Sequence, residues 1–135
     1  EGNCCWVKIC EEESIIQNKK IVYKINTEII KNLNLNEMAV ILQAGYMWGK
    51  ISKKIGISYI KETNSNKFPD MVGIKENIDG NLKYINIEFE SISSNFIRHK
   101  HPINKCNVII CWIHDWIECP KHIQVIELRN ILINN

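Results

Sequence analysis

The clearest periodic pattern of hydrophobic residues begins after Asn36 and predicts a helix that ends at Gly56. Asn36 is a favoured N-cap residue, and Glu37 lies in the first turn, where the helix dipole stabilises an acid. Glycine commonly follows the last helical residue, which suits Gly56. Gly45 and Gly49 are four residues apart, a spacing typical of close packing against a neighbour. The hydrophobic residues expected on one buried face are Met38, Ile41, Leu42, Met47, Trp48, Ile51 and Ile55.

Hydrophobic runs bounded by turn residues predict β-strands in the rest of the chain. Asp79-Gly80 predicts a tight hairpin turn. In the strand after this turn, Ile85, Ile87 and Phe89 alternate with polar residues, which indicates one hydrophobic and one polar face. The expected strands are residues 57–61, 70–75, 83–90, 108–113 and 123–128.

The order of these elements predicts an α/β fold. A short helix is expected at residues 92–100, and the almost continuous apolar run at 108–113 indicates a buried strand inside the sheet. From residue 36 the order is αβββαβ with one further strand, which predicts a mixed central sheet flanked by helices. The 135 residues suit a single domain, with a core at 36–135 and an N-terminal extension of unknown role at 1–35. Short strands or irregular structure are expected at 4–10 and 21–25.

Composition and charge are those of an ordinary globular protein. The net charge is +2 and charged residues make up 24% of the chain, so global charge does not indicate a nucleic-acid binder, although a local basic face would suffice for one. No apolar run approaches the roughly 20 residues that span a bilayer. The N-terminal residues lack the basic and apolar regions of a signal peptide. We therefore expect a cytoplasmic protein without a membrane partner.

The cysteines are expected to be reduced, because a protein without a signal peptide usually stays in a reducing compartment. Cys111 lies in an apolar run and is expected to be a small buried residue. A disulfide framework is the less favoured alternative for the six cysteines, which are Cys4, Cys5, Cys10, Cys106, Cys111, Cys119. A structural zinc site is a further alternative, although its candidate ligands lack paired C-x₂-C spacing. Those candidate ligands are His99, His101, Cys106, Cys111, His114, Cys119 and His122.

Three acids are expected to meet at the open end of the predicted hairpin. Glu88 and Glu90 are two residues apart on one strand, so both project from the same face with Cα atoms about 6.5 Å apart. Asp70 begins the partner strand, at a similar distance from the turn. Like charges held close repel, and oxygen ligands suit Mg²⁺ or Mn²⁺, so we expect a divalent cation there. The alternative is that Glu88 and Glu90 form the solvent face of an edge strand.

Pro69-Asp70, followed after a hairpin by Glu88-x-Glu90 within αβββαβ, resembles the PD-(D/E)xK nuclease superfamily over about residues 36–128. This resemblance implies a restriction-endonuclease-like core that hydrolyses nucleic-acid phosphodiesters with Mg²⁺. Glu90 replaces the usual lysine, and the resemblance implies a role for it as general base or as a second metal ligand. Glu37 matches an acid that many members place near the site, although it also fits a simple first-turn residue.

A basic segment follows the two acids directly. Its side chains would grip phosphates, and a histidine would assist proton transfer near neutral pH. The alternative is a solvated helix end, where basic residues favour the dipole. The residues expected to bind nucleic acid are Ser94, Asn95, Arg98, His99, Lys100 and His101.

Two later features are weaker candidates. Trp112 and Trp116 are expected to pack in the protein rather than to stack on bases. His114 and Asp115 would form a hydrogen-bonded pair near the site, because strand ends in α/β sheets often carry function.

The function expected from these residues is an endonuclease that cleaves DNA with a metal-activated water, with RNA left open as a substrate. Asp70 and Glu88 would hold Mg²⁺ or Mn²⁺, and a homodimer would be needed to cut both strands. One alternative is a catalytically inactive nucleic-acid-binding or interaction module that retains the nuclease fold, which the missing lysine favours. A zinc-stapled interaction domain is the other.

Overall fold

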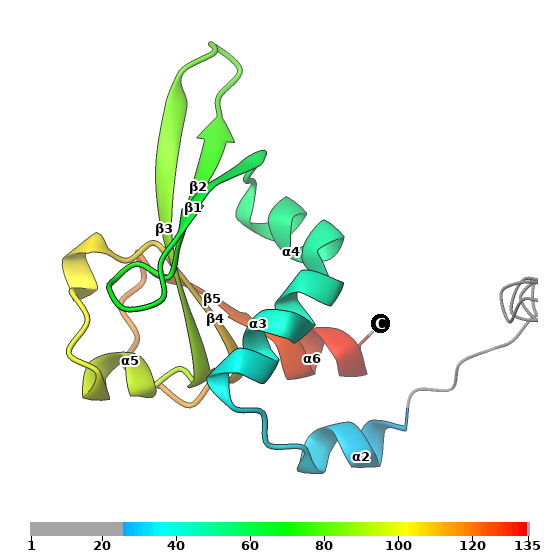
Figure 1. The fold of residues 1–135 in the computed structure, drawn as a ribbon. Helices are drawn as coiled ribbons and strands as arrows, with labels where there is room; N and C mark the ends of the chain where they lie inside the picture. Colours follow the sequence, from blue (N-terminus) through cyan, green and yellow to red (C-terminus); the bar gives the residue numbers. More distant parts are fainter. Residues whose placement is uncertain (1–25, 135) are drawn as a thin grey trace, which may run out of the picture.

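A mixed five-stranded sheet forms the centre of the computed structural model, which describes residues 26–134 (Figure 1). The strand order is β1-β2-β3-β4-β5. β1, β2 and β3 are antiparallel, whereas β3, β4 and β5 are parallel. The strands are β1 (Tyr59–Thr63), β2 (Met71–Glu76), β3 (Leu82–Ile92), β4 (Val108–Ile113) and β5 (Gln124–Glu127). The predicted α/β class with a mixed sheet flanked by helices is therefore confirmed.

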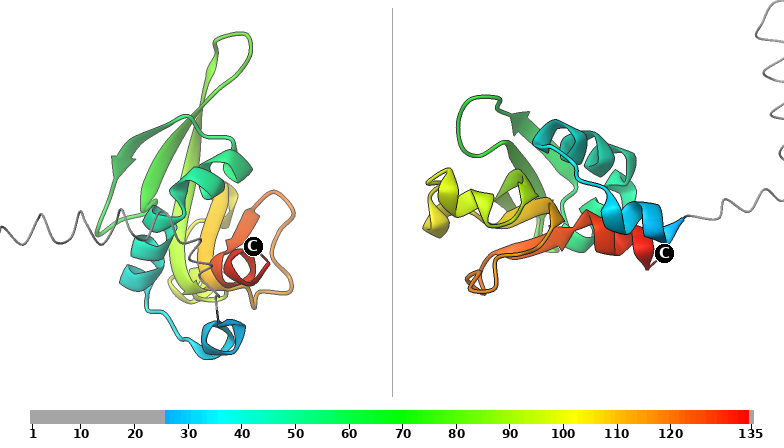
Figure 2. Two further views of the ribbon diagram at one scale, coloured as in Figure 1. Left: turned by 90° about the vertical axis from the view of Figure 1, so that its right-hand side faces the viewer. Right: turned by 90° about the horizontal axis from the view of Figure 1, so that it is seen from below.

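Helices cover both faces of the sheet. Figure 2 shows, seen from below, that α5 and the 3-10 helix η1 lie on the opposite side of the strands from α2 and α6. In Figure 1, α3 and α4 lie on the same side as α6. The helices are α2 (Thr27–Asn32), α3 (Glu37–Tyr46), α4 (Trp48–Ile55), α5 (Asn95–Arg98), η1 (Ile103–Lys105) and α6 (Leu128–Ile133).

The single helix predicted after Asn36 is interrupted at Met47, where the backbone has φ −102° and ψ 11°. Its two ends are as predicted. The Asn36 side chain accepts a hydrogen bond from the Ala39 N–H at 2.9 Å, and Gly56 ends α4 with φ 79°. The interruption falls between two glycines, a common location for helix kinks.

The predicted buried face of this helix is partly wrong. Met38 and Leu42 are 63% and 68% exposed. The predicted burial of Met47, Ile51 and Ile55 is confirmed, and Val40 and Ala44, which were not predicted, are buried with them. The face that packs on the sheet therefore includes two smaller residues that the sequence analysis passed over in favour of larger ones.

The close packing expected at Gly45 and Gly49 is also wrong, because a Cβ at either position would meet nothing within 4 Å. A glycine with that function lies elsewhere, at Gly73 in β2. A Cβ there would lie 3.0 Å from Cγ2 of Ile57, so the Ile57 side chain would have to shift to accommodate any larger residue.

The predicted strands agree with the observed ones to within two residues at each end. One difference between the predicted and observed strands changes an element: Leu128, predicted as the last residue of a strand, is the first residue of α6. Neither α6 nor α2 was predicted. The expectations for residues 4–10 and 21–25 lie outside the described residues.

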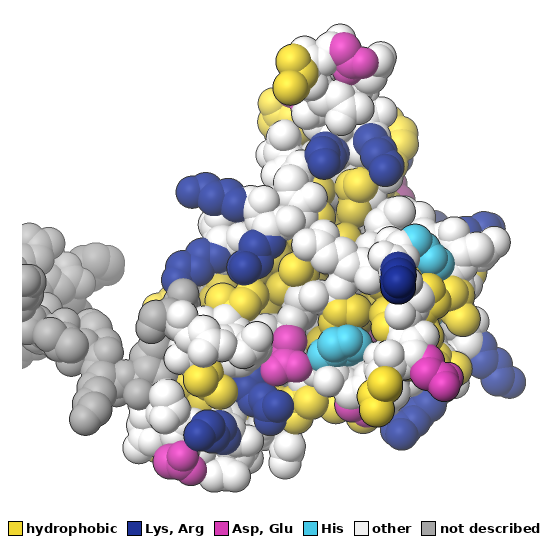
Figure 3. All heavy atoms as spheres, turned by 180° about the vertical axis from the view of Figure 1, so that it is seen from behind, with side chains coloured by type: hydrophobic (Ala, Val, Ile, Leu, Met, Phe, Trp, Pro, Cys, Tyr) yellow, Lys and Arg dark blue, Asp and Glu magenta, His cyan; other side chains and the backbone are white. Residues whose placement is uncertain are grey.

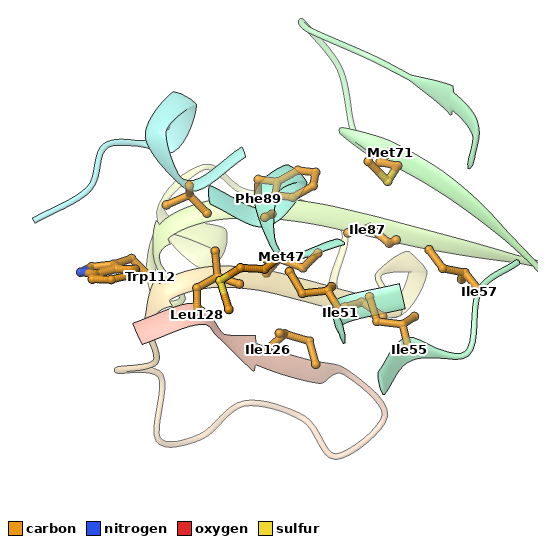
Figure 4. Packing of buried hydrophobic residues seen from close by; sticks show 14 of the residues in the cluster. Met47, Ile51, Ile55, Ile57, Met71, Ile87, Phe89, Trp112, Ile126 and Leu128 are labelled. Carbon is orange, nitrogen blue, oxygen red and sulfur yellow. The ribbon is translucent and has the colours of Figure 1, made fainter. Parts of the chain in front are cut away.

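Two hydrophobic clusters pack against the sheet, one on each face. Figure 4 shows the larger cluster, to which Ile87 and Phe89 of β3 and Ile51 and Ile55 of α4 belong. The smaller cluster lies beneath α5 on the opposite face. Its buried members are Phe96, Cys106, Ile109, Cys111, Trp116 and Ile123.

The expected burial of the two tryptophans and of Cys111 is confirmed. Trp112 and Trp116 are buried, and the Trp112 Nε1–H donates a hydrogen bond to the Leu33 carbonyl at 2.7 Å. Cys111 is fully buried. Cys106, Cys111 and Cys119 are free thiols, while Cys4, Cys5 and Cys10 lie outside the described residues.

None of the helices between residues 26 and 134 is long and apolar enough to cross a bilayer.

Candidate metal centre

Asp70 and Glu88 meet at the open end of the β2–β3 hairpin, as the turn position predicts. Met71 pairs with Ile87, which places Asp70 beside Glu88. The Asp70 N–H donates to Glu88 Oε2 at 3.1 Å, and the Phe89 N–H donates to Asp70 Oδ2 at 2.8 Å. These two hydrogen bonds fix both carboxylates against the end of the hairpin.

Glu88 and Glu90 are buried on the same face of β3, with 3% and 1% of each residue exposed. β3 is the central strand, between β2 and β4. The alternative that these acids form the solvent face of an edge strand is therefore wrong. Two carboxylates buried side by side need compensation, because burial of a charge without a partner is costly.

Two histidines from the segment after α5 supply part of this compensation. His101 Nε2 lies 3.0 Å from Glu88 Oε1 and 3.7 Å from Glu90 Oε1. His99 Nδ1 lies 3.1 Å from Glu90 Oε1. Lys100, between the histidines, has φ 57°, a left-handed conformation that turns the chain sharply at this point.

The buried acids hold protons more tightly than exposed ones. Burial, reinforced by the charge of Asp70, raises the pKa of Glu88 to about 8. Burial raises the pKa of Glu90 to about 7, although His99 acts in the opposite direction. Burial also raises the pKa of Asp70 and lowers that of His101. Near neutral pH, the metal-free centre therefore shares protons among carboxylates that would ionise readily in water.

The most compact set of possible metal ligands is not the predicted one. Among residues 26–134, the one group of three or more such side chains with ligand atoms all within 4.8 Å of one another is Glu90, His99 and His101. It has only Glu90 in common with the predicted set of Asp70, Glu88 and Glu90. Glu90 Oε2 is buried and has no hydrogen-bond partner in the described part of the chain.

A pocket of about 630 Å³ lies beside Asp70, between the start of α3 and the β1–β2 connection. Glu37 and Asp70 both line it. The charge of Glu37 is one of the smaller contributions to the raised pKa values of Asp70, Glu88 and Glu90, after burial. The other lining residues are Asn36, Met38, Ile41, Thr63, Asn64, Ser65, Met71 and Phe89.

Of the residues expected to bind phosphates, some are engaged in hydrogen bonds within the protein and others are exposed to solvent. Ser94 Oγ donates to Asp115 Oδ2 at 2.6 Å, and Asn95 Nδ2 donates to Ser91 Oγ at 3.0 Å. These two side chains hold α5 in place. Arg98 and Lys100 are exposed next to the histidines in sequence. On the face in Figure 3, the Lys and Arg side chains are scattered around an area where acidic and histidine side chains meet.

The expected His114–Asp115 pair does not form. Both side chains instead contact the Ser93 hydroxyl, with distances of 2.8 Å to His114 Nδ1 and 3.2 Å to Asp115 Oδ1. Although burial opposes it, hydrogen bonds from Ser94 and Ser93 lower the pKa of Asp115. Sequence reasoning missed Ser93, which is fully buried, because its hydrogen bonds join segments 21 to 23 residues apart.

Of the candidate zinc ligands within the described residues, two histidines belong to the compact group, and the cysteines do not. Cys106 and Cys111 are buried in the smaller hydrophobic cluster, and no cysteine between residues 26 and 134 belongs to the compact group. A cysteine-based zinc staple is therefore not formed in this part of the chain.

Comparison of the chain with models of protein families, with curated proteins and with solved structures found no match.

Proposed function

We propose that this protein is a metal-dependent endonuclease that hydrolyses DNA phosphodiester bonds, with a restriction-endonuclease-like core at residues 36–135. The observation that carries the proposal is the pair of buried carboxylates, Glu88 and Glu90, next to Asp70, which itself lines a pocket. Buried acids whose pKa values are raised in this way mark functional sites more often than structural ones.

The donor groups fit a divalent cation. Asp70 and Glu88 would hold Mg²⁺ or Mn²⁺ through oxygen atoms, which are the ligands that both ions accept. When bound, the cation would supply a water of lowered pKa and neutralise charge on the phosphate. The unpartnered oxygen of Glu90 is consistent with a cation or a proton as its missing partner.

The remaining residues would position substrate and move a proton. Glu90, whose pKa is raised to about 7, would accept a proton from the attacking water near neutral pH. Glu37 would act from the opposite wall of the pocket. Arg98 and Lys100, both exposed, would contact the phosphate backbone. Since one site cuts one strand, cleavage of duplex DNA would need a homodimer, in a protein that we propose to be cytoplasmic.

The test is cleavage of plasmid, linear duplex, single-stranded DNA and RNA, each with Mg²⁺, Mn²⁺ or chelator. Wild-type protein should cut DNA with either metal and not with chelator. Asp70→Asn should reduce the rate at least about 100-fold, because it removes a ligand charge without changing side-chain volume. Asp79→Asn makes the same chemical change at the exposed hairpin turn and should keep full activity. Equal cleavage by wild type and Asp70→Asn would refute the proposed site.

A second candidate is a catalytically inactive module that binds nucleic acid, favoured by Glu90 at the position where the resemblance implies lysine. This candidate predicts a gel shift with DNA and no cleavage under any metal condition. Cleavage that requires Asp70 would eliminate it.

A further inference from the structure

We propose that Glu90, His99 and His101 form a distinct site for a transition-metal cation of the Zn²⁺ type, next to the oxygen-only pair of Asp70 and Glu88. The inference rests on the proposed function in one respect, since Glu90 is a candidate ligand in both. It goes further by dividing the centre into two sites with different metal preferences.

The three ligand atoms are close to the spacing that a cation requires. His99 Nδ1 and His101 Nε2 lie 3.1 and 3.7 Å from the same oxygen of Glu90, and the three residues' ligand atoms are all within 4.8 Å of one another. Ligands of a tetrahedral zinc ion, at 2.0 to 2.2 Å from the metal, are about 3.4 Å apart. Small side-chain movements would therefore complete the site.

Glu90 provides a second, independent observation. It is 1% exposed, and its Oε2 has no hydrogen-bond partner among residues 26–134. A protonated His99 would satisfy Oε1 at 3.1 Å. His101 lies closer to Glu88 than to Glu90, so Oε2 would still lack a partner among the described residues. A cation bound to the carboxylate compensates the charge of both oxygens. An ion pair with one oxygen compensates that charge less completely.

The three proposed ligands are positioned by the central sheet and by neighbouring aromatic rings, and solvent can reach the site. Glu90 projects from the central strand, next to Cys111 of β4. The His101 ring packs against both Phe96 and Phe68, with ring centroids 5.3 and 5.8 Å away, and the two phenylalanines also contact each other. The His99 side chain is 46% exposed, so an ion can enter from that side.

The donor atoms select the class of cation. Imidazole nitrogen suits Zn²⁺, Fe²⁺ and related ions, whereas Mg²⁺ prefers oxygen and keeps its waters. Two histidines and one carboxylate leave a fourth tetrahedral position open, the arrangement of catalytic rather than structural zinc sites. The Asp70–Glu88 pair has only oxygen donors and suits Mg²⁺.

The experiment uses the full chain in a background where Cys4, Cys5 and Cys10 are replaced by serine, so that zinc bound by these cysteines does not obscure the result. Chelator-treated protein is titrated with Co²⁺, followed by visible absorption, and with Zn²⁺ and Mg²⁺ by calorimetry. We expect one Zn²⁺ per chain, displacement of Co²⁺ by Zn²⁺, and no competition by Mg²⁺ for this site.

Variants locate the site. His99→Gln and His101→Gln should each weaken Zn²⁺ binding more than about 100-fold, since loss of an outer-shell partner alone costs roughly 10–100-fold. His122→Gln is the matched control, because His122 is exposed, lies outside the group and, among residues 26–134, hydrogen-bonds to the Ile103 carbonyl. It should bind Zn²⁺ as the parent does. His99 is nearly half exposed, so its replacement should leave the fold intact even if that of His101 does not.

The outcomes separate this inference from the proposed function. Zinc binding that requires His99, in a protein that cleaves nothing, supports the site and refutes the nuclease. Mg²⁺-dependent cleavage that requires Asp70, in a protein that binds no Zn²⁺ or Co²⁺, supports the nuclease and overturns the site. Zinc binding that is unchanged in both His99→Gln and His101→Gln also overturns it.

Discussion

Glu90 projects into the protein from the central strand, and its environment makes its charge costly. Burial raises the pKa of Glu90 to about 7 and that of its neighbour Glu88 to about 8. In the unfolded chain both would ionise near pH 4.5. The folded, metal-free protein therefore retains protons that the unfolded chain has already lost.

This difference predicts how stability depends on pH without metal. His101 acts in the opposite direction near pH 6.5, because burial lowers its folded pKa from that value while the unfolded form still binds a proton there. Its contribution is smaller than that of the two acids and fades as pH rises above 6.5. The folded state then binds more protons than the unfolded state, and the free energy of unfolding should fall as pH rises from 6.5 to 8. The slope is at most about 1.4 kcal/mol per pH unit for each proton. Urea unfolding in chelator, at half-unit pH steps, measures it.

The control for this prediction is Glu88→Gln, which keeps the size of the side chain and cannot ionise. Its stability should fall less over the same pH range. A saturating divalent cation should flatten or reverse the slope, because it binds the ionised form of the folded state. A stability that rises between pH 6.5 and 8 in chelator would contradict the raised pKa values.

At the scale of elements, the two glycines within α3 and α4 have room for a side chain in the described part of the structure. A Cβ at Gly45 would meet no atom within 4 Å. Gly45→Ala should therefore raise the free energy of unfolding by about 0.5–1 kcal/mol, since alanine loses less backbone entropy in a helix. Urea unfolding with a constant m-value would show it.

Gly56 is the matched comparison, because its φ of 79° lies in the left-handed region. Gly56→Ala should lower stability by about 1 kcal/mol or more, as a Cβ strains that conformation. If both alanine variants changed stability in the same direction, the distinction between a free and a required glycine would fail.

Individual elements also show which parts of the fold could be predicted from the sequence. Alternation along β3 placed Ile87 and Phe89 on one face and Glu88 and Glu90 on the other, because the period of a strand is fixed by its backbone. The helix face was harder to predict. Met38 and Leu42 are larger and more hydrophobic than Val40 and Ala44, yet close approach to the sheet favours the smaller pair.

The positions of the acids in the candidate metal centre follow from the geometry of the hairpin and could be predicted. The positions of the histidines depend on tertiary contacts and could not. The hairpin brings Asp70 to Glu88 because the two are similarly far from the turn. The approach of His99 and His101 to Glu90 depends on how the chain leaves α5 through the left-handed Lys100. Neither the period of a strand nor that of a helix encodes this path, so the histidine contribution to the metal group could be proposed only loosely from sequence.

At the scale of the whole molecule, part of the predicted N-terminal extension packs on the core. Ile30 of α2 is 9% exposed and belongs to the larger hydrophobic cluster. The Trp112 Nε1–H, from β4, donates to the Leu33 carbonyl at 2.7 Å. The folded core therefore includes residues before Asn36. Through Ile30 and Leu33, the segment at α2 contacts the sheet and the larger hydrophobic cluster.

Two truncated chains test this arrangement. The chain 36–135 should be about 2–4 kcal/mol less stable than 26–135, because it loses the burial of Ile30 and leaves the Trp112 N–H without its partner. Thermal and urea unfolding of the two chains measure the difference. Trp112→Phe in 26–135 removes the hydrogen bond and keeps an aromatic ring, so it should account for only about 1 kcal/mol of the loss. Equal stability of the two truncated chains would show that α2 does not belong to the folded core.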